Sequence, residues 1–232
     1  MSTNLTNLRF SRIERETVQQ RVYEVLRDQL MRGGFEPGQK LKIAELAAAF
    51  GTSAMPVREA LNRLAAERAV EALPNRSVRV PTLSRSVLQD LREARFAVEG
   101  LAVERAAAHM TAATLDRLRE LISSQSVRDA EHAPEASSEQ NRAFHFAIYR
   151  ESASTVLLPI IESLWLQFGP YLRIASERFS GRDGTNFHVK IVRALARGEG
   201  AAARAALESD IGRAFDLVMT DQSLWRHRGA AT

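Results

Sequence analysis

The sequence contains no cysteine among its 232 residues. Disulfide bonds, thiol chemistry and thiolate metal sites are therefore excluded. The sequence also has no apolar run of membrane-spanning length. Its polar first segment, MSTNLTNLRFSRIERE, has the features of neither a signal peptide nor a membrane anchor. These absences predict a cytoplasmic protein.

Several markers of catalysis are missing as well. The sequence has no motif for a Ser or Cys nucleophile, no Gly-rich phosphate loop and no evident general base. A metal-dependent enzyme stays open only as an alternative, in which a few His and Asp residues bind a hydrolytic metal and the N-terminal region is an interaction module. The absences favour a protein that is not an enzyme.

The positive charge is unevenly distributed. Hydrophobic residues make up 45% of the chain, which is enough for one large or two smaller globular domains. Residues 1–82 carry 13 Lys/Arg and 9 Asp/Glu, whereas the remainder carries 19 of each. Because phosphate neutralisation drives much of nucleic-acid affinity, this split indicates a DNA-binding N-terminal part on a neutral body. The net charge of +4 is small, so an uneven surface without function remains the alternative.

The first periodic segment predicts a helix that begins at Thr17 and ends at Gly33-Gly34. Thr17 and Gln20 match a capping box, and one apolar stripe follows at helical spacing. Residues 1–16 show no periodicity and are expected to form a flexible arm. Residues 35–42 contain Pro37-Gly38 and are expected to form a turn-rich connection.

Residues 43–66 predict two short helices joined by a tight turn. The first ends at Gly51, and Thr52 or Ser53 can cap the second, whose first turn holds Pro56. An apolar inward face leaves three residues of the second helix pointing outward: Met55, Arg58 and Asn62. This geometry matches a helix-turn-helix that inserts its second helix into the major groove.

A β-hairpin, or wing, is predicted directly after these helices. Residues 70–73 and 78–80 are β-prone runs, and the turn between them carries Asn75 and Arg76 at its tip. An ordinary helical hairpin followed by a β-turn is the alternative, because helix-turn-helix spacing is a permissive signal.

Helical periodicity alone continues from about residue 82 to the end. The fold class is therefore mostly α, with a winged helix-turn-helix followed by an all-α bundle. The fourth bundle helix is apolar on more than one face, so we expect it in the middle of the bundle or across a dimer interface, with a kink at Pro170. The expected bundle helices span residues 85–110, 115–130, 138–151, 155–176, 186–197 and 201–222.

Four polar residues stand on apolar stripes of these helices: Asn141, His145, His188 and Asp210. All four are expected to point into the core, where a polar group without a partner costs several kcal/mol. A histidine satisfied by a core hydrogen bond explains any one of them. Four such residues on three helices favour a shared site, which binds a metal or a ligand.

Arg95 shares an apolar stripe of the first bundle helix, and Glu99 lies one turn further on. An internal Arg–Glu pair and a contact to an effector are both open, since guanidinium groups bind carboxylates through paired hydrogen bonds. Tyr171 and Arg173, after Pro170, are further candidates for the rim of an effector pocket.

The motif PVREAL (56–61), preceded by FGTSAM and followed by NRLAAERAVEALPNRSVRV, resembles the winged helix of the GntR family of bacterial transcription regulators. The resemblance places a DNA-binding domain at 17–81 and implies that Arg58 contacts operator DNA. Many relatives have Arg-Thr just before the Pro, where this chain has Ala54-Met55, so contacts to thymine methyl groups are expected there instead. The residues expected at the DNA are Ser53, Met55, Arg58, Asn62, Asn75 and Arg76.

Residues from about 86 to 218 resemble the FCD effector domain of the FadR branch of that family, which places the second domain at 82–232. The family pattern of one Asp and three His falls on Asn141, His145, His188 and Asp210, so only the two middle ligands match. The resemblance implies a divalent metal, for which zinc, nickel and manganese suit this N/O set, and a metal-free polar pocket is the alternative. The expected effector contacts are Arg95, His145, Tyr171, Arg173 and His188.

Together these features predict a ligand-responsive regulator that binds double-stranded operator DNA. A homodimer is expected, because two recognition helices on a two-fold axis read a palindromic operator. The resemblance implies that a small carboxylate is the effector. A non-specific architectural DNA-binding protein is a further alternative. The sequence leaves open the effector, the operator and the sign of regulation.

Overall fold

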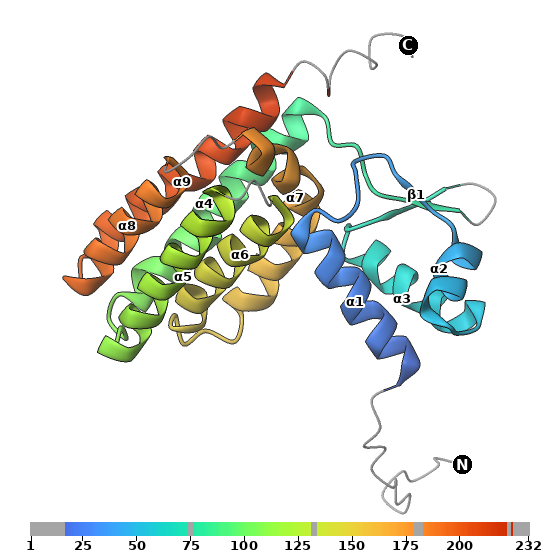
Figure 1. Cartoon of the computed structure of the whole chain (residues 1–232), viewed down its shortest axis with the longest axis horizontal. Coiled ribbons are helices and arrows are strands. Elements are labelled where there is room, and N and C mark those ends of the chain that lie inside the picture. The colour runs from blue at the N-terminus through green and yellow to red at the C-terminus, as the bar shows by residue number, and fades with distance from the viewer. Residues whose placement is uncertain (1–16, 74–76, 131–133, 179–182, 222–223, 225–232) are drawn as a thin grey trace, which may run out of the picture.

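The computed structural model describes residues 17–73, 77–130, 134–178, 183–221 and 224, and it has a winged helix-turn-helix followed by an α-helical bundle (Figure 1). The mostly α fold class is thereby confirmed. The N-terminal part contains α1 (Val18–Arg32), β1 (Lys40–Leu41), α2 (Ile43–Phe50), α3 (Ala54–Ala66), β2 (Glu71–Ala72) and β3 (Val78–Arg79). The bundle contains α4 (Arg85–Ala106), α5 (Ala112–Ala130), α6 (Pro134–Arg150), α7 (Leu157–Arg178), α8 (Asp183–Ala196) and α9 (Gly200–Thr220).

The helix ends follow local capping signals. The Thr17 side chain accepts a hydrogen bond from the Gln20 amide and so caps α1, as predicted. Gly33 and Gly51 end α1 and α2 in the left-handed region, at φ of 76° and 62°, where glycine carries no Cβ penalty. Ser53 takes the position before α3 but forms no side-chain capping bond.

The predicted connection at 35–42 contains a strand that the sequence did not reveal. β1 pairs antiparallel with β3, which also pairs with β2, so the sheet order is β1-β3-β2. Lys40 and Glu71 both lie opposite Arg79, and Arg79 forms an ion pair of 2.5 Å with Glu71. The expected wing hairpin is present, but the wing-tip residues 74–76 lie outside the described part of the chain.

The bundle helices start and stop within a few residues of the expected positions. The helix expected from residue 138 begins earlier, at Pro134, the first residue of α6, where its missing amide hydrogen costs nothing. The first bundle helix ends at Ala106, earlier than expected. α7 runs on through Pro170, which lies inside the helix.

α7 lies between the bundle and the N-terminal part. It packs against α4, α6 and α9 on one side and against α1 on the other, in agreement with its broad apolar surface (Figure 1). α1 in turn packs against α3, so α1 separates the bundle from the helix-turn-helix. Among the described helices, none is long and apolar enough to cross a membrane.

Candidate DNA interface and buried His–Asp site

The predicted recognition helix α3 buries one face and exposes the other. Its inward side chains form part of the core and are fully buried: Val57, Ala60, Leu61 and Leu64. Ser53, Met55, Arg58 and Asn62 are exposed, with Met55 62% accessible. The helix therefore presents one guanidinium, one amide and one apolar side chain to a partner. Asn75 and Arg76, expected at the wing tip, fall outside the described residues.

α3 is held in place by a polar cluster with α1. The Tyr23 hydroxyl donates to Glu67 at 2.7 Å, and the guanidinium of Arg63 stacks 3.6 Å from the centre of the Tyr23 ring. Burial, followed by the hydrogen bond to Glu67, raises the pKa of Tyr23 to about 12. This cluster orients the exposed face of α3 relative to α1.

The bundle brings three of the four predicted core polar residues together. Donor atoms of His145 on α6, His188 on α8 and Asp210 on α9 all lie within 4.8 Å of one another. The Asp210 Oδ2 atom lies 3.1 Å from His145 Nε2 and 3.5 Å from His188 Nε2. Asn141 is half-buried on α6, one turn before His145. The prediction that these residues share a site therefore rests on His145, His188 and Asp210.

The two buried histidines differ in how many of their ring nitrogens have hydrogen-bond partners. His145 Nδ1 lies 3.2 Å from the Tyr149 hydroxyl, whereas neither ring nitrogen of His188 has a hydrogen-bond partner within the described residues. The His188 ring stacks on Phe144, with 4.0 Å between ring centres. Both histidines are at most 2% exposed. An unsatisfied nitrogen at such a position usually indicates a bound ion, ligand or water.

Burial and the neighbouring charges set the ionisation of the site. Burial lowers the pKa of His145 more than Asp210 raises it, which favours the neutral imidazole. Burial alone would raise the pKa of Asp210, but His188 and His145 lower it well below its usual range. Asp210 is therefore expected to be an ionised carboxylate.

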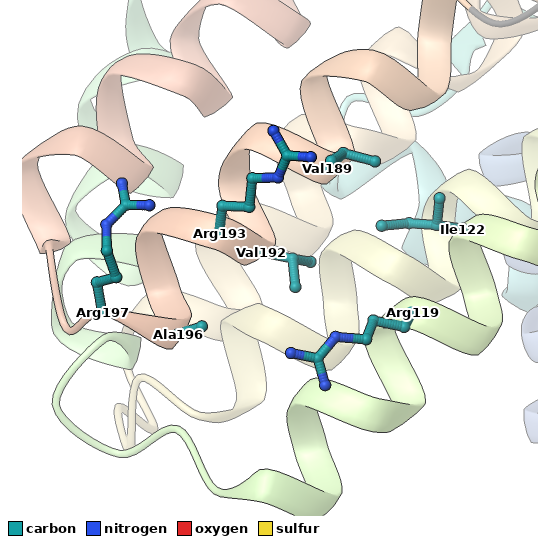
Figure 2. A pocket seen from close by; sticks show the side chains of 7 residues that line it. All are labelled: Arg119, Ile122, Val189, Val192, Arg193, Ala196 and Arg197. Carbon is teal, nitrogen blue, oxygen red and sulfur yellow. The ribbon is translucent and has the colours of Figure 1, made fainter.

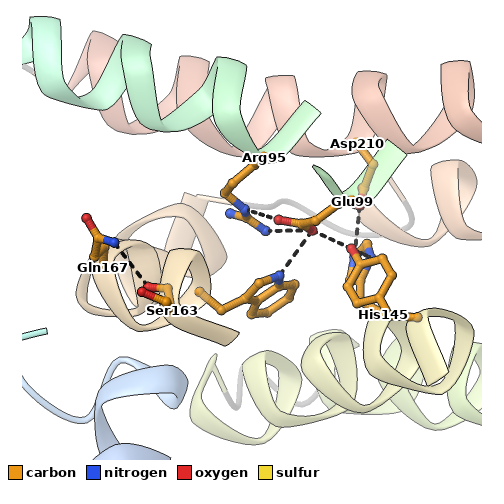
Figure 3. A network of polar contacts seen from close by, with 8 residues as sticks. Arg95, Glu99, His145, Ser163, Gln167 and Asp210 are labelled. Carbon is orange, nitrogen blue, oxygen red and sulfur yellow. Dashed lines mark hydrogen bonds and ion pairs between the residues drawn. The ribbon is translucent and has the colours of Figure 1, made fainter. Parts of the chain in front are cut away.

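A network of buried hydrogen bonds extends from His145 to Arg95 (Figure 3). Tyr149 forms a very short hydrogen bond to Glu99 Oε2, to which Trp165 Nε1 also donates at 3.1 Å. Arg95 donates to both carboxylate oxygens of Glu99, at 2.6 and 3.3 Å. The sequence predicted the Arg95–Glu99 pair as one of two alternatives, but it did not reveal Tyr149. The spacing of four residues from His145 to Tyr149 was the available signal.

The guanidinium of Arg95 is enclosed by aromatic rings. It lies 4.7 Å from the ring centre of Trp165, 5.1 Å from that of Phe168 and 5.7 Å from that of Phe215. Arg95 is 3% exposed, and its partner Glu99 is fully buried. An acid that bound Arg95 would have to compete with Glu99.

The remaining effector candidates lie at the contact between the two parts of the chain. The Tyr171 hydroxyl accepts a hydrogen bond of 2.7 Å from the Leu83 amide in the segment before α4. The Cβ of Arg173 is packed against Gly33 at the end of α1. These positions connect α7 to the N-terminal part, a relationship that the sequence pattern did not predict.

A separate surface hollow lies between α5 and α8 (Figure 2). Its volume is about 240 Å³, and it contains none of the predicted effector contacts. Two of its arginines already have acidic partners, since Arg119 pairs with Asp116 and Arg197 with Glu199, both at 2.6 Å. The lining residues are Arg119, Ile122, Val189, Val192, Arg193, Ala196 and Arg197.

Comparison with known proteins identifies both parts. Residues 18–80 match the model of bacterial regulatory proteins of the gntR family, and residues 90–213 match the FCD domain. The HTH-type transcriptional regulator McbR of Escherichia coli is 34% identical over 152 residues, which cover 66% of this chain and 69% of McbR. The HTH-type transcriptional repressor GlaR of the same species is 30% identical over 147 residues, covering 62% of this chain and 67% of GlaR.

The fold comparison agrees with the sequence comparison. The solved structure of E. coli McbR/YncC superposes with a TM-score of 0.84 and 27% identity, and the match covers 90% of this chain and 100% of that one. The winged helix and the helical bundle thus occur together in a related regulator. The chain belongs to the GntR family of bacterial regulatory proteins and is a DNA-binding transcription regulator with a C-terminal FCD domain.

Proposed function

We propose that this regulator senses a small organic acid through a divalent metal held by His145, His188 and Asp210. The observation that carries this proposal is the Nε2 atom of buried His188, which forms no hydrogen bond within the described residues and lies 3.5 Å from the Asp210 carboxylate. Two donors on one zinc ion, at about 2.0–2.2 Å each, lie roughly 3–3.5 Å apart. The observed separations of 3.1 and 3.5 Å from Asp210 to the two histidines fit that spacing.

The hydrogen-bond arrangement at His145 also favours a cation. Tyr149 directs its hydroxyl hydrogen to Glu99, so its oxygen is free to accept a hydrogen bond from His145 Nδ1, which lies 3.2 Å away. A neutral imidazole carries one ring hydrogen, which leaves a lone pair on Nε2 facing the Asp210 carboxylate. A cation bound between Nε2 and the carboxylate would offset the repulsion in this tautomer.

Asn141 is a further candidate ligand through its amide oxygen, one turn before His145. A divalent ion bound by this N/O set would offer open positions to a carboxylate of the effector. Zinc, nickel and manganese are the candidate ions. Arg95, Tyr171 and Arg173 are kept as proposed effector contacts, although Arg95 and Tyr171 are both buried.

Effector binding is proposed to act on DNA affinity through the contact between α1 and the bundle. α6 carries His145 on one side and Arg142 on another, and Arg142 pairs with Asp28 of α1 at 2.8 Å. Movement of α6 at the buried site would therefore shift α1, and with it the helix α3 that packs against α1. Residues 17–81 would serve as the DNA-binding domain, residues 82–232 as the sensing and dimerisation domain, and residues 1–16 as an arm.

The proposal includes a homodimer on a palindromic operator, which two-fold recognition requires. It includes no catalytic role, in keeping with relatives that are named as transcription regulators. A metal-dependent enzyme would instead show turnover in metal-loaded protein that does not bind DNA. An architectural protein would bind DNA without sequence preference and without a response to acids.

Thermal unfolding of metal-stripped and metal-reloaded protein tests the site, with a panel of small carboxylates added to each. We expect zinc, nickel or manganese to raise the unfolding temperature and one acid to raise it further, since ligands that bind only the folded state stabilise it. Asp210→Asn should remove the metal-dependent shift. Asp216→Asn, which changes an exposed carboxylate on the same helix, should keep it. An identical shift in both variants would refute the proposed ligand set.

Operator binding must be measured in parallel with the same samples. We expect the acid that stabilises the metal-loaded protein to change the affinity for a selected operator sequence. Stabilisation without any change in DNA affinity would separate a structural metal site from a sensing one.

A further inference from the structure

We propose that Tyr149 and Glu99 are positioning residues for His145, and that they present its Nε2 atom to the metal. This inference rests on the proposed metal site and names the residues that tune it. Tyr149 and Glu99 have no part in the ligand set, and they reach it through Nδ1, the second ring nitrogen of His145.

The first step concerns the single hydroxyl hydrogen of Tyr149. Two acceptors lie within reach, namely Glu99 Oε2 and His145 Nδ1. A carboxylate oxygen is a stronger acceptor than an imidazole nitrogen, so we place the hydroxyl hydrogen of Tyr149 on the bond to Glu99. The Tyr149 oxygen is then an acceptor for His145, which requires the hydrogen of that ring to reside on Nδ1. Nε2 is left with the free lone pair that a metal ligand needs.

The second step concerns what keeps Glu99 an acceptor. Glu99 is fully buried, and three side chains from α4, α6 and α7 donate to it: Arg95, Tyr149 and Trp165. Arg95 supplies the opposite charge at 2.6 Å, and a buried carboxylate with such a partner and three donors is a strong hydrogen-bond acceptor. Side chains from three helices thus hold the Glu99 carboxylate, which is the acceptor of the Tyr149 hydrogen bond, in place.

The third step compares the two histidines. His145 is held at Nδ1 by Tyr149, whereas His188 Nδ1 has no partner among the described residues. Ligating histidines usually donate their second ring hydrogen to an oxygen, and loss of that partner typically lowers metal affinity by about 10–100-fold. In this chain the support is built for His145 alone. Removal of the Tyr149 hydroxyl should therefore affect metal binding although Tyr149 touches no metal.

The test uses the full-length protein and zinc alone as the probe. Tyr149→Phe keeps the ring and deletes only the hydroxyl. We expect its zinc dissociation constant, measured by competition with a chromogenic chelator, to rise by about 10–100-fold. The visible absorption of the cobalt-loaded protein should also change, because that spectrum reports the ligand field, which a merely structural role of Tyr149 would leave unaltered.

Tyr23→Phe provides a matched control. It deletes the same group from another buried tyrosine that donates to a glutamate, in the winged helix rather than the bundle. Its zinc affinity and cobalt spectrum should equal those of the wild type. Equal zinc affinities of Tyr149→Phe and wild type, within about twofold, would overturn the inference while leaving the metal site intact. Failure of the wild type to bind zinc, nickel or manganese would overturn the proposed site and this inference together.

A second measurement detects the ring hydrogen in the wild-type protein itself. In zinc-loaded protein with ¹⁵N-labelled histidine, His145 should show an Nδ1–H resonance that exchanges slowly with solvent, because that hydrogen is buried against Tyr149. The chain has five histidines, and the resonance can be assigned by its loss in His145→Gln. A His145 ring with its hydrogen on Nε2, or with none protected, would contradict the inference.

Discussion

Gly169 of α7 lies directly against the backbone of Leu30 in α1. A Cβ atom at Gly169 would overlap the Leu30 carbonyl oxygen and would stand 2.9 Å from Met31 Cα. The two helices belong to different parts of the regulator. The missing side chain of Gly169 lets their backbones lie close together. No residue larger than glycine fits there without movement of α1.

Gly169→Ala is therefore expected to loosen the docking of α1. Alanine is normally favoured over glycine inside a helix, but the clash should reverse this and destabilise the protein by about 1–3 kcal/mol. Chemical denaturation measures the loss. Spin labels on cysteines introduced at exposed Ala66 and Ala113 should report a longer or broader distance between the two parts.

Gly212→Ala is the matched control for this substitution. Gly212 also lies inside a bundle helix, yet a Cβ there would meet only Phe96 Cζ at 3.4 Å. This variant should be as stable as the wild type or more so, with an unchanged label distance. Equal effects of both substitutions would show that the α1–α7 contact is not special.

The ion pair between Asp28 and Arg142 is expected to couple α1 to α6. Its side chains are 26–32% exposed, so we expect an interaction free energy of about 1 kcal/mol, reduced by salt. A double-mutant cycle of Asp28→Asn and Arg142→Gln measures it. The exposed pair of Arg119 and Asp116 is a suitable control and should give a value near zero. A coupling that does not respond to salt would argue against an electrostatic contact.

Arg58→Ala should weaken operator binding by about 1–3 kcal/mol if its guanidinium reads a base. The measurement is a titration against an operator found by selection from random DNA, at several salt concentrations. Arg105→Ala, which removes an exposed arginine of α4, should leave the affinity unchanged. An unaltered affinity of Arg58→Ala would mean that α3 is not the recognition helix, whereas a uniform loss on all sequences would indicate a phosphate contact.

The raised pKa of Tyr23 leads us to expect that the free energy of unfolding falls in alkaline solution. Its pKa is raised to about 12, above the usual value near 10, so the unfolded state loses this proton first as the pH rises. The stabilisation is complete below pH 10 and is lost between about pH 10 and 12. Denaturation midpoints of the wild type should fall more steeply in this window than those of Tyr23→Phe. Parallel pH curves would contradict the assignment.

Sequence patterns within one or two helical turns were sufficient to predict most of the helices. The bond from the Gln20 amide to Thr17 and the left-handed Gly51 are local structures, and their residues predicted them. β1 was missed because two residues acquire strand geometry only by pairing with β3, which follows almost 40 positions later. The helix expected from residue 138 begins at Pro134, because a proline fits the first turn of a helix as well as the loop before it.

For the buried site, the stripes of the helices predicted which way His145, His188 and Asp210 point. They could not predict the distances between them, because α6, α8 and α9 are brought together only by the packing of the bundle. The same limit explains Tyr171, which was expected at a pocket rim. Its hydroxyl lies on the Leu83 amide because α7 runs beside the connection to α4.

The sequence by itself determined the helices, the exposed face of α3 and the polar residues that enter the core, because each depends on periodicity and capping within a short segment. The tertiary structure decided which of those residues meet, since hydrogen bonds and ion pairs across 50 or more positions require the final packing. Glu99 shows the difference. Its spacing predicted the pair with Arg95, but only the packing of α4 against α6 and α7 placed its carboxylate on Tyr149 and Trp165.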